Sequence, residues 1–390
     1  MPASRVRTSQ IILTLILLCF LENGKSLAQE PANGISPAAK VYLDQALDLM
    51  QKEALHKKSV DWARVRKETL AHAKGAQSTF DTYPAIAFAL TQLQEHHSWL
   101  QLPDSLPMEK RQEINAEITA IRGKSETESK ASPFFPQKEM QGHIDRYGAG
   151  IFAHVAVPMC VGPYSEWEKN GPYFQEFVDK LHGIVMDLQS QKPQGWIIDL
   201  RGNGGGNMWP MLAGIGIVIG EGDLGAFISA DDERAPWFYR SGKAGIRMSD
   251  GKEDVSSEMK QPPFAFSELP WVALLFDRGT GSSGEAVAIS FAGRPRARSF
   301  GEHTGGFSTS NQRYPLPDGA SLFLCNGIEA DRTGKLYPDG LEPDTRVPET
   351  DTRPAEEKDA VILAAEQWLA TQTRPTTKSG KSAEKRKARV

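Results

Sequence analysis

Apolar residues recur at helical spacing near the start of the chain. Leu43, Leu47 and Met50 share one face of a helix that would follow Ser36 and Pro37. The same spacing recurs in Trp62, Val65, Thr69 and Ala73, which follow the N-cap candidate Asp61. It recurs again in Ile86, Leu90 and Leu93, which follow Thr82 and Pro84. These spacings predict amphipathic helices packed as a small bundle, followed by a polar helix and linker over residues 101–135.

From about Tyr147 the pattern changes to short apolar runs that alternate with longer amphipathic ones. "GIFAHVAVPM", "GWIIDL" and "WVALLFD" are typical of buried strands, "YFQEFVDKLHGIVMDLQSQ" of a helix, and residues 283–293 of another helix. "NQRYPLPDGASLFLC" predicts a hairpin turning at Pro317–Gly319, and "EKDAVILAAEQWLA" a closing helix. Alternating strands and helices predict an α/β core with a parallel sheet and crossover helices.

The first residues have the pattern of a secretory signal. Arg5 and Arg7 precede the apolar run "IILTLILLCF", and small residues follow, ending at Ala28. The run is too short to span a membrane, and no other segment is apolar enough to do so. We therefore expect cleavage near Ala28, export to the periplasm or the extracellular space, and no integral membrane segment after cleavage.

Composition divides the rest of the chain into three parts. We expect an N-terminal helical cap over residues 29–130, a core domain over 131–370, and a basic, disordered tail over 371–390 that is poor in apolar residues. Without the net positive charge of the signal and the tail, the body is clearly acidic, which argues against a nucleic-acid surface. Cys160 and Cys325 lie in this body, and export permits a disulfide between them without requiring one.

Two segments of the core carry candidate chemistry. "DLRGNGGGNM", residues 199–208, follows a strand, and its glycines can expose backbone N–H groups to an anion or an oxyanion. It lacks the Lys-Ser/Thr ending of a P-loop and the third glycine of a dinucleotide fingerprint. "GTGSSGEAVAISF", residues 279–291, puts two serines at the start of a helix, where a serine is normally an N-cap. No spacing indicates a metal site, and no cofactor is implied.

Four motifs together resemble a known family. "GWIIDLRGNGGGNM", "WVALLFDRGTGSSGEAVAISFAG", "RSFGEHTGG" and "DGLEPD" are similar, in order and spacing, to the core of the carboxy-terminal-processing (tail-specific) serine peptidases. The resemblance implies a crotonase-like spiral core and makes Ser282, the first serine of "SSGE", the nucleophile. It also implies an oxyanion hole formed by the N–H of Ser283 and an N–H of the glycine loop, for which we choose Gly205.

The expected base departs from much of this family. Many members carry a lysine where "GEHTGGF" has Phe307, so a Ser-Lys dyad is excluded at that position. The members that lack the lysine, the tricorn and nisin-resistance types, use a histidine from the region before the sheet, and "EHHSW" puts His97 there. A neutral imidazole is a suitable base for a serine hydroxyl near neutral pH. His96 and His303 are the competing candidates.

The remaining site residues are less constrained. Ser98 or Asp339 could orient His97, and Asn207 and Met208 match the nisin-resistance type and could line the substrate groove, or simply start the next helix. No segment of the size of a PDZ domain fits between His97 and the sheet, so substrate selection falls to the cleft and the cap.

These observations predict an exported serine endopeptidase with a Ser-His mechanism. It would cleave peptides or the C-terminal tails of proteins, bound as an extended strand. One alternative is a catalytically inactive ligand- or peptide-binding relative, against which His97 beside an intact "SSGE" argues. The other is a crotonase-like acyl-CoA enzyme, against which export argues.

Overall fold

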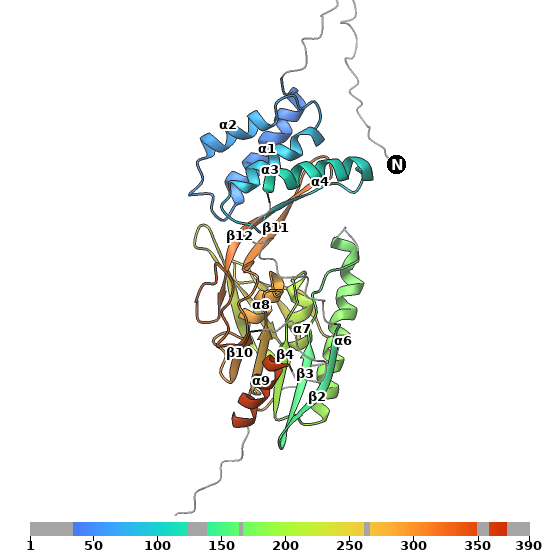
Figure 1. Ribbon diagram of the computed structural model, residues 1–390, viewed down its shortest axis with the longest axis vertical. Coiled ribbons are helices and arrows are strands. Elements are labelled where there is room, and N and C mark those ends of the chain that lie inside the picture. The colour runs from blue at the N-terminus through green and yellow to red at the C-terminus, as the bar shows by residue number, and fades with distance from the viewer. Residues whose placement is uncertain (1–33, 124–138, 164–166, 261–265, 349–358, 373–390) are drawn as a thin grey trace, which may run out of the picture.

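The computed structural model describes residues 34–123, 139–163, 167–260, 266–348 and 359–372 (Figure 1). The predicted signal over 1–28 and residues 373–390 of the predicted tail lie outside these ranges. The helices are α1 (Pro37–Glu53), α2 (Trp62–His72), α3 (Tyr83–Thr91), α4 (Met108–Arg122), α6 (Gly171–Ser190), α7 (Met208–Ile219), α8 (Ser283–Ile289) and α9 (Ala360–Gln372), with 3-10 turns η1 (Phe80–Thr82) and η2 (Trp167–Asn170).

The N-terminal helices form as the sequence predicts. Ser36 caps α1 by accepting the N–H of Ala39, and Asp61 caps α2 by accepting the N–H of Arg64. The predicted apolar face of α1 is wholly buried in a cluster that α3 and β12 also line. Figure 1 shows α1–α4 gathered at one end of the molecule.

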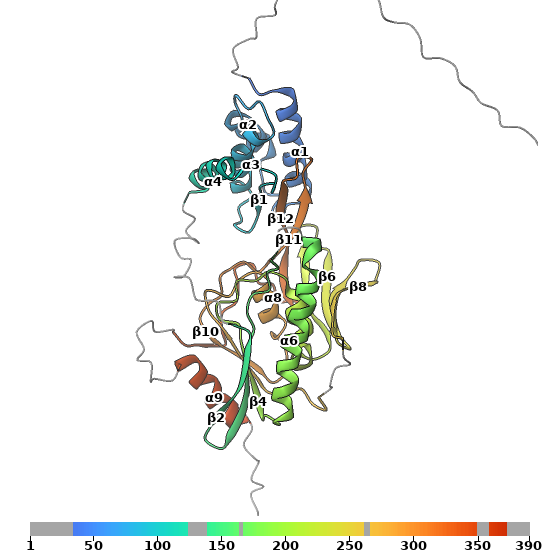
Figure 2. The ribbon, with the colours of Figure 1, turned by 90° about the vertical axis from the view of Figure 1, so that its right-hand side faces the viewer.

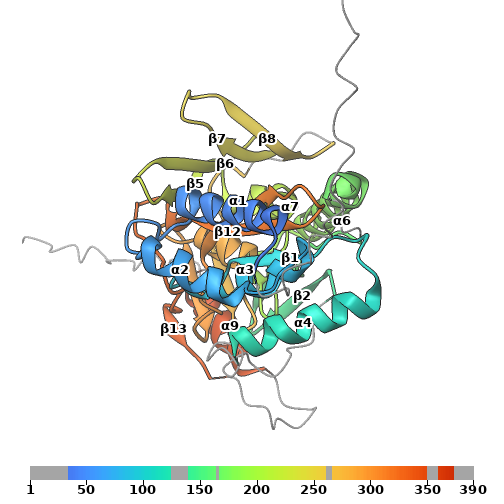
Figure 3. The ribbon, with the colours of Figure 1, turned by 90° about the horizontal axis from the view of Figure 1, so that it is seen from above.

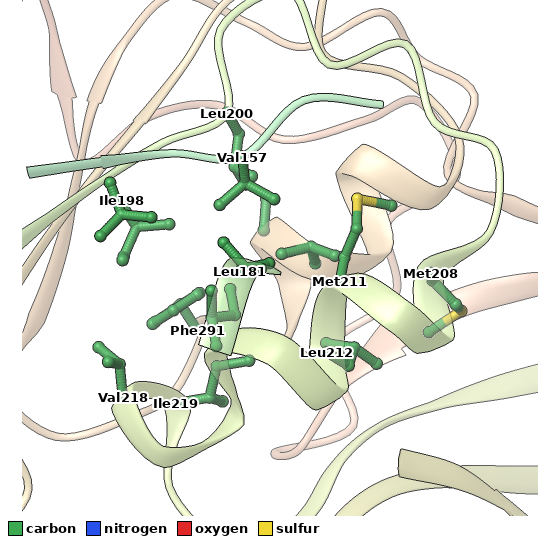
Figure 4. Close-up of a cluster of buried hydrophobic side chains, with 14 of the residues drawn as sticks. Val157, Leu181, Ile198, Leu200, Met208, Met211, Leu212, Val218, Ile219 and Phe291 are labelled. Carbon is green, nitrogen blue, oxygen red and sulfur yellow. The ribbon is translucent and has the colours of Figure 1, made fainter. Parts of the chain in front are cut away.

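A six-stranded sheet forms the centre of the other end. Its order is β13-β10-β9-β4-β3-β2, and every pair is parallel except the β2–β3 hairpin. The strands are β2 (Gln141–Tyr147), β3 (Gly150–Ala156), β4 (Gly195–Asp199), β9 (Val272–Phe276), β10 (Ala297–Gly301) and β13 (Thr345–Arg346). α9 packs on one face, and α6, α7 and α8 pack on the other, over the apolar cluster drawn in Figure 4. The predicted parallel sheet with crossover helices is confirmed, whereas β2 was not predicted.

A second sheet is entirely antiparallel, and the sequence predicted only its β11–β12 hairpin. Its order is β1-β12-β5-β6-β7-β8, with β11 paired to β12. The strands are β1 (Trp99–Gln101), β5 (Gly222–Ser229), β6 (Arg234–Arg240), β7 (Lys243–Arg247), β8 (Glu253–Glu258), β11 (Thr309–Pro315) and β12 (Ser321–Asp331). Figure 3 shows β5–β8 extending to one side of the molecule.

The predicted hairpin is formed by β11 and β12, and it joins the two ends of the molecule (Figure 2). At its tip, Asp318 accepts the hydroxyls of Tyr42 and Tyr83, each at 2.7 Å. β1 pairs with β12 next to the tip, with Trp99 opposite Phe323. This pairing fixes the segment just before β1, which contains His97, against the α/β core.

The sequence permitted a disulfide between Cys160 and Cys325 and predicted no membrane-spanning segment in the mature chain. Cys160 and Cys325 are buried and free, so they form no disulfide with each other, and burial raises the pKa of both thiols. Within the described ranges, no helix is long and apolar enough to cross a bilayer.

Candidate active site

Ser282 occupies a strained turn between β9 and α8. Its backbone has φ 52° and ψ −124°, a conformation that residues other than glycine seldom adopt. The N-cap serine of α1, Ser36, instead has the extended backbone that is usual for a cap. A cap alone does not require positive φ, whereas a nucleophile presented on a sharp turn between a strand and a helix does.

Glu285, one turn into α8, holds this turn together. Its Oε2 accepts the N–H groups of Ser282 and Phe307, both at 2.8 Å. Its Oε1 accepts the N–H of Gly306 at 2.9 Å and the hydroxyl of Thr304 at 2.5 Å. The side chain of Glu285 is fully buried, so these four donors replace its hydration. One carboxylate therefore connects the Ser282 turn to the segment around Phe307.

The glycine loop packs directly on this turn. A Cβ added to Gly205, which has φ 111°, would lie 2.8 Å from Ser282 Cβ and 3.0 Å from the N atom of Ser283. Only glycine allows so close an approach. The Asn203 side chain fixes the loop, because its Nδ2 donates to the carbonyl of Val157 and its Oδ1 accepts the N–H of Gly205 at 3.0 Å.

The free donors of this loop differ from our expectation. Gly205 was predicted to donate its N–H to an oxyanion, but that N–H already donates to Asn203. The carbonyl of Gly205 accepts the N–H of Cys160, so the N–H of Gly206, which belongs to the same trans peptide, points away from Cys160. No acceptor is recorded within the described residues for the N–H of Gly206 or of Ser283. The carbonyl of Gly206 accepts the Ser283 hydroxyl at 2.7 Å, which links the two residues that carry these donors.

His97 lies beside the same turn, although it comes from the N-terminal part of the chain. Its ring packs against the Phe307 ring at 62°, with 5.4 Å between the centroids, and Phe307 shares Glu285 with Ser282. Its Nδ1 is 2.8 Å from Thr309 Oγ1, and within the described residues no partner is recorded for Nε2. Burial lowers the pKa of His97 to about 4, partly offset by Glu95, so the ring is neutral near pH 7.

The group that contacts the imidazole was missed in the sequence. Ser98 does not contact it, because its Oγ accepts the N–H of Cys325 at 2.8 Å, and no hydrogen bond joins Asp339 to His97 in the described residues. The group that contacts Nδ1 of His97 is Thr309 Oγ1. The only signal for it was a run of hydroxyl residues after Phe307, which says nothing about a partner 212 residues away.

Glu95 and Cys325 complete the surroundings of His97. Glu95 Oε2 accepts the N–H groups of His97 and Ser98, at 2.6 and 3.0 Å, and the thiol of Cys325 at 3.1 Å. Glu95 Oε1 is buried and has no hydrogen-bond partner among the described residues. Cys325 Sγ is also 3.3 Å from Thr309 Oγ1. A carboxylate thus lies close to the ring without touching it.

The other predicted site residues lie elsewhere or have other roles. His96 is exposed, and His303 Nδ1 bonds to the carbonyl of Thr304 at 2.6 Å. Asn207 caps α7 by accepting the N–H of Trp209. Met208, which was expected to line a groove, is 5% exposed and packs into the cluster under α7 (Figure 4). Asn207 and Met208 therefore start a helix, the second of the two readings that the sequence allowed.

This geometry agrees with comparisons to known proteins. The model of Peptidase family S41 matches residues 165–347, a range that contains the glycine loop, Ser282 and Thr309. The chain carries an S41 peptidase domain. The resemblance to the tail-specific peptidases is thereby confirmed. The nisin-resistance protein of Lactococcus lactis subsp. lactis is 24% identical over 303 residues, covering 78% of this chain and 81% of that protein.

Two solved structures share the fold of most of this chain, including the residues that match the S41 family. A lipoprotein from Streptococcus agalactiae superposes with a TM-score of 0.59 at 19% identity, over 87% of this chain and 98% of its own. The photosystem II D1 C-terminal processing protease superposes with a TM-score of 0.53 at 14% identity, over 80% and 94%. Both alignments extend well beyond the matched family range.

Proposed function

We propose that this chain is an exported serine endopeptidase in which Ser282 is the nucleophile and His97 the base. The observation that carries the proposal is the strained backbone of Ser282, which is held against the glycine loop. In the described part of the chain, the N–H groups of Gly206 and Ser283 have no recorded acceptor. Strain of this kind persists only where the surrounding structure imposes it, and it concentrates at functional sites. The S41 domain supplies the reaction class, the cleavage of peptide bonds.

The reaction follows from the groups around Ser282. His97 Nε2 takes the proton of the Ser282 hydroxyl as Oγ attacks the peptide carbonyl, and the N–H groups of Ser283 and Gly206 stabilise the resulting oxyanion. When the C–N bond breaks, His97 returns the proton to the leaving amine. A water molecule then hydrolyses the acyl-enzyme by the same route, which regenerates the free hydroxyl.

Thr309 and Glu95 act through His97. With the Nδ1 proton donated to Thr309 Oγ1, the basic lone pair stays on Nε2. The Glu95 carboxylate, which raises the pKa of His97, stabilises the positive imidazolium that forms during each proton transfer. In a Ser-His-Asp triad a single aspartate both orients the imidazole and stabilises its positive charge. Here Thr309 orients the ring and Glu95 stabilises the charge.

The substrate would be a peptide or a protein tail in an extended conformation. The relatives are named for nisin resistance and for C-terminal processing of a photosystem protein, and both names indicate peptide or tail substrates. The lipoprotein and the nisin-resistance protein also support an exported or envelope location. Cleavage near Ala28 is proposed from the signal pattern of the sequence. We further propose a crotonase-like spiral for the core domain over 131–370 and a cap role for residues 29–130, between which the peptide would enter.

A fluorophosphonate probe tests this function directly. The purified mature protein is expected to react covalently at Ser282, because such probes require an activated serine and an oxyanion hole. The labelled residue is located by peptide mapping, with Ser282→Ala as the unlabelled control. A folded protein that binds peptides but takes up no label would instead be the inactive binding relative.

We expect Thr309→Val to lower kcat about 10- to 100-fold with little change in KM. Valine keeps the shape of threonine but cannot accept the Nδ1 proton, so the ring loses the bond that selects its reactive tautomer. Thr309→Ser, which restores a hydroxyl, should recover most of the rate. Equal losses in both variants, or a change in KM alone, would contradict an orienting role.

A further inference from the structure

Outside the active site, the β2–β3 hairpin brings together two histidines and an aspartate that the sequence left unconnected. His143 and Asp145 lie on the same face of β2, and His154 lies directly opposite His143 on β3. One ligand atom from each of the three side chains lies within 4.8 Å of the others.

We propose that His143, Asp145 and His154 bind a divalent transition-metal ion of the zinc class. Asp145 Oδ2 is 2.9 Å from His154 Nδ1, and Asp145 Oδ1 is 3.3 Å from His143 Nε2. Ligand atoms about 2.1 Å from a tetrahedral Zn²⁺ lie about 3.4 Å from one another, so small side-chain adjustments bring all three within bonding distance. Two imidazoles and a carboxylate favour zinc and its neighbours over Mg²⁺ or Ca²⁺.

The environment of His154 provides the second argument. If Nδ1 binds the ion, Nε2 must carry the proton, and Nε2 lies 3.5 Å from Asp199 Oδ2. Asp199 is itself fixed by Arg201, whose Nε and Nη2 donate to its two oxygens at 3.0 and 2.8 Å. His154 and Asp199 are both buried, at 4% and 2% exposed. A carboxylate behind a ligating imidazole is the arrangement that orients metal-binding histidines in proteins.

The three side chains differ in exposure, so that one end of the site is fixed in the sheet and the other is open to solvent. His154 is buried and held by the sheet, Asp145 is half-buried, and His143 is 51% exposed on the outer strand. The ion could enter from the His143 side, and a water molecule could complete four-coordination there. The centroids of the His143 and His154 rings are 4.6 Å apart, so both imidazoles lie close enough to share one ion with Asp145.

The site belongs to the framework and not to the catalytic centre. It lies at the edge of the six-stranded sheet, on the face that α9 covers. Arg201, behind the site, also pairs with Asp359, next to the start of α9, at 2.7 Å. Asp199 is the first residue of the "DLRGNGGG" segment. A bound ion would therefore stiffen the β2 edge and the base of the glycine loop.

Metal titration of the mature chain, produced without a polyhistidine tag and treated with a chelator, tests the proposal. We expect calorimetry to show one equivalent of Zn²⁺ with a Kd of about 1 µM or tighter, and Co²⁺ to give tetrahedral d–d absorption. The unfolding temperature should rise with Zn²⁺. None of these measurements depends on peptide cleavage, so the outcome is independent of the proposed protease activity.

His143→Ala is the deciding variant, because this exposed side chain can be removed without disturbing the sheet. It should weaken Zn²⁺ binding at least about tenfold and abolish the thermal shift. His72→Ala, which removes an exposed histidine of α2, is the matched control and should bind as the parent does. Absence of stoichiometric binding, or equal binding by His143→Ala and the parent, would overturn the proposal and leave an ion pair of His154 with its carboxylates.

Discussion

Replacing Ser282 with alanine is expected to abolish peptide cleavage, with a loss in kcat of about 10⁴- to 10⁶-fold. The substitution removes the proposed nucleophilic oxygen but leaves the N–H groups of Ser283 and Gly206 in place. The fold should persist, because Ser282 is held by its backbone N–H bond to Glu285. Cleavage of a reporter peptide and the unfolding temperature of the same preparation are the two measurements.

A second substitution at this position separates strain from chemistry. Ser282→Gly should be equally inactive but at least as stable as the parent, because glycine adopts φ 52° without steric cost. Ser283→Ala is the matched control: it loses the hydroxyl bond to the Gly206 carbonyl but keeps the N–H donor, so most activity should remain. Unchanged turnover by Ser282→Ala would refute the peptidase mechanism proposed here.

The parts of the fold that the sequence predicted have strong local patterns. The N-terminal helices, the buried parallel strands and the β11–β12 hairpin each follow from residue spacing or turn residues within a short window. β8, with the sequence "EDVSSE", is almost entirely exposed, and β2 is a polar edge strand. Such strands form because a neighbour provides hydrogen bonds, so their own residues carry little signal.

In the active site, too, the sequence predicted the residues that lie in local motifs and missed the contacts that depend on distant parts of the chain. Ser282, Ser283 and the glycine loop are close in the structure because each follows a strand of one sheet, which a motif can indicate. The choice between Gly205 and Gly206 as donor depends on where the Asn203 side chain donates and accepts. Thr309 contacts His97 only because β1 and β11 both pair with β12. The spacing of residues along the sequence does not show which distant strands pair with each other.

The metal site depends on the register of a single hairpin. His143 and His154 face each other because the turn between β2 and β3 spans Gly148 and pairs Tyr147 with Gly150. A shift of one residue would move His154 to the opposite face of the sheet. Because β2 was not recognised as a strand, the pairing could not be inferred, although all three candidate ligands were visible in the sequence.

His97→Ala is expected to lower kcat to within about tenfold of the Ser282→Ala value, because members of one catalytic unit are not additive. Ser282 cannot lose its proton unaided near pH 7, and Phe307 occupies the position where the family's lysine would be. His96→Ala and His303→Ala are the matched controls and should cost much less, since one side chain is exposed and the other is bonded to a backbone carbonyl. An inactive His303→Ala with an active His97→Ala would instead place the base in the core domain.

The pH profile gives an independent test of the same base. Only the neutral imidazole accepts a proton, so activity should rise with pH through the pKa of His97 and stay level above it. An ordinary histidine would put this rise near about 6.5, but burial lowers the pKa of His97 to about 4. Glu95→Gln removes the charge that raises this pKa, so it should shift the rise further toward acid and lower kcat by destabilising the imidazolium. A rise well above neutral pH in the parent, unchanged in Glu95→Gln, would exclude His97 as the base.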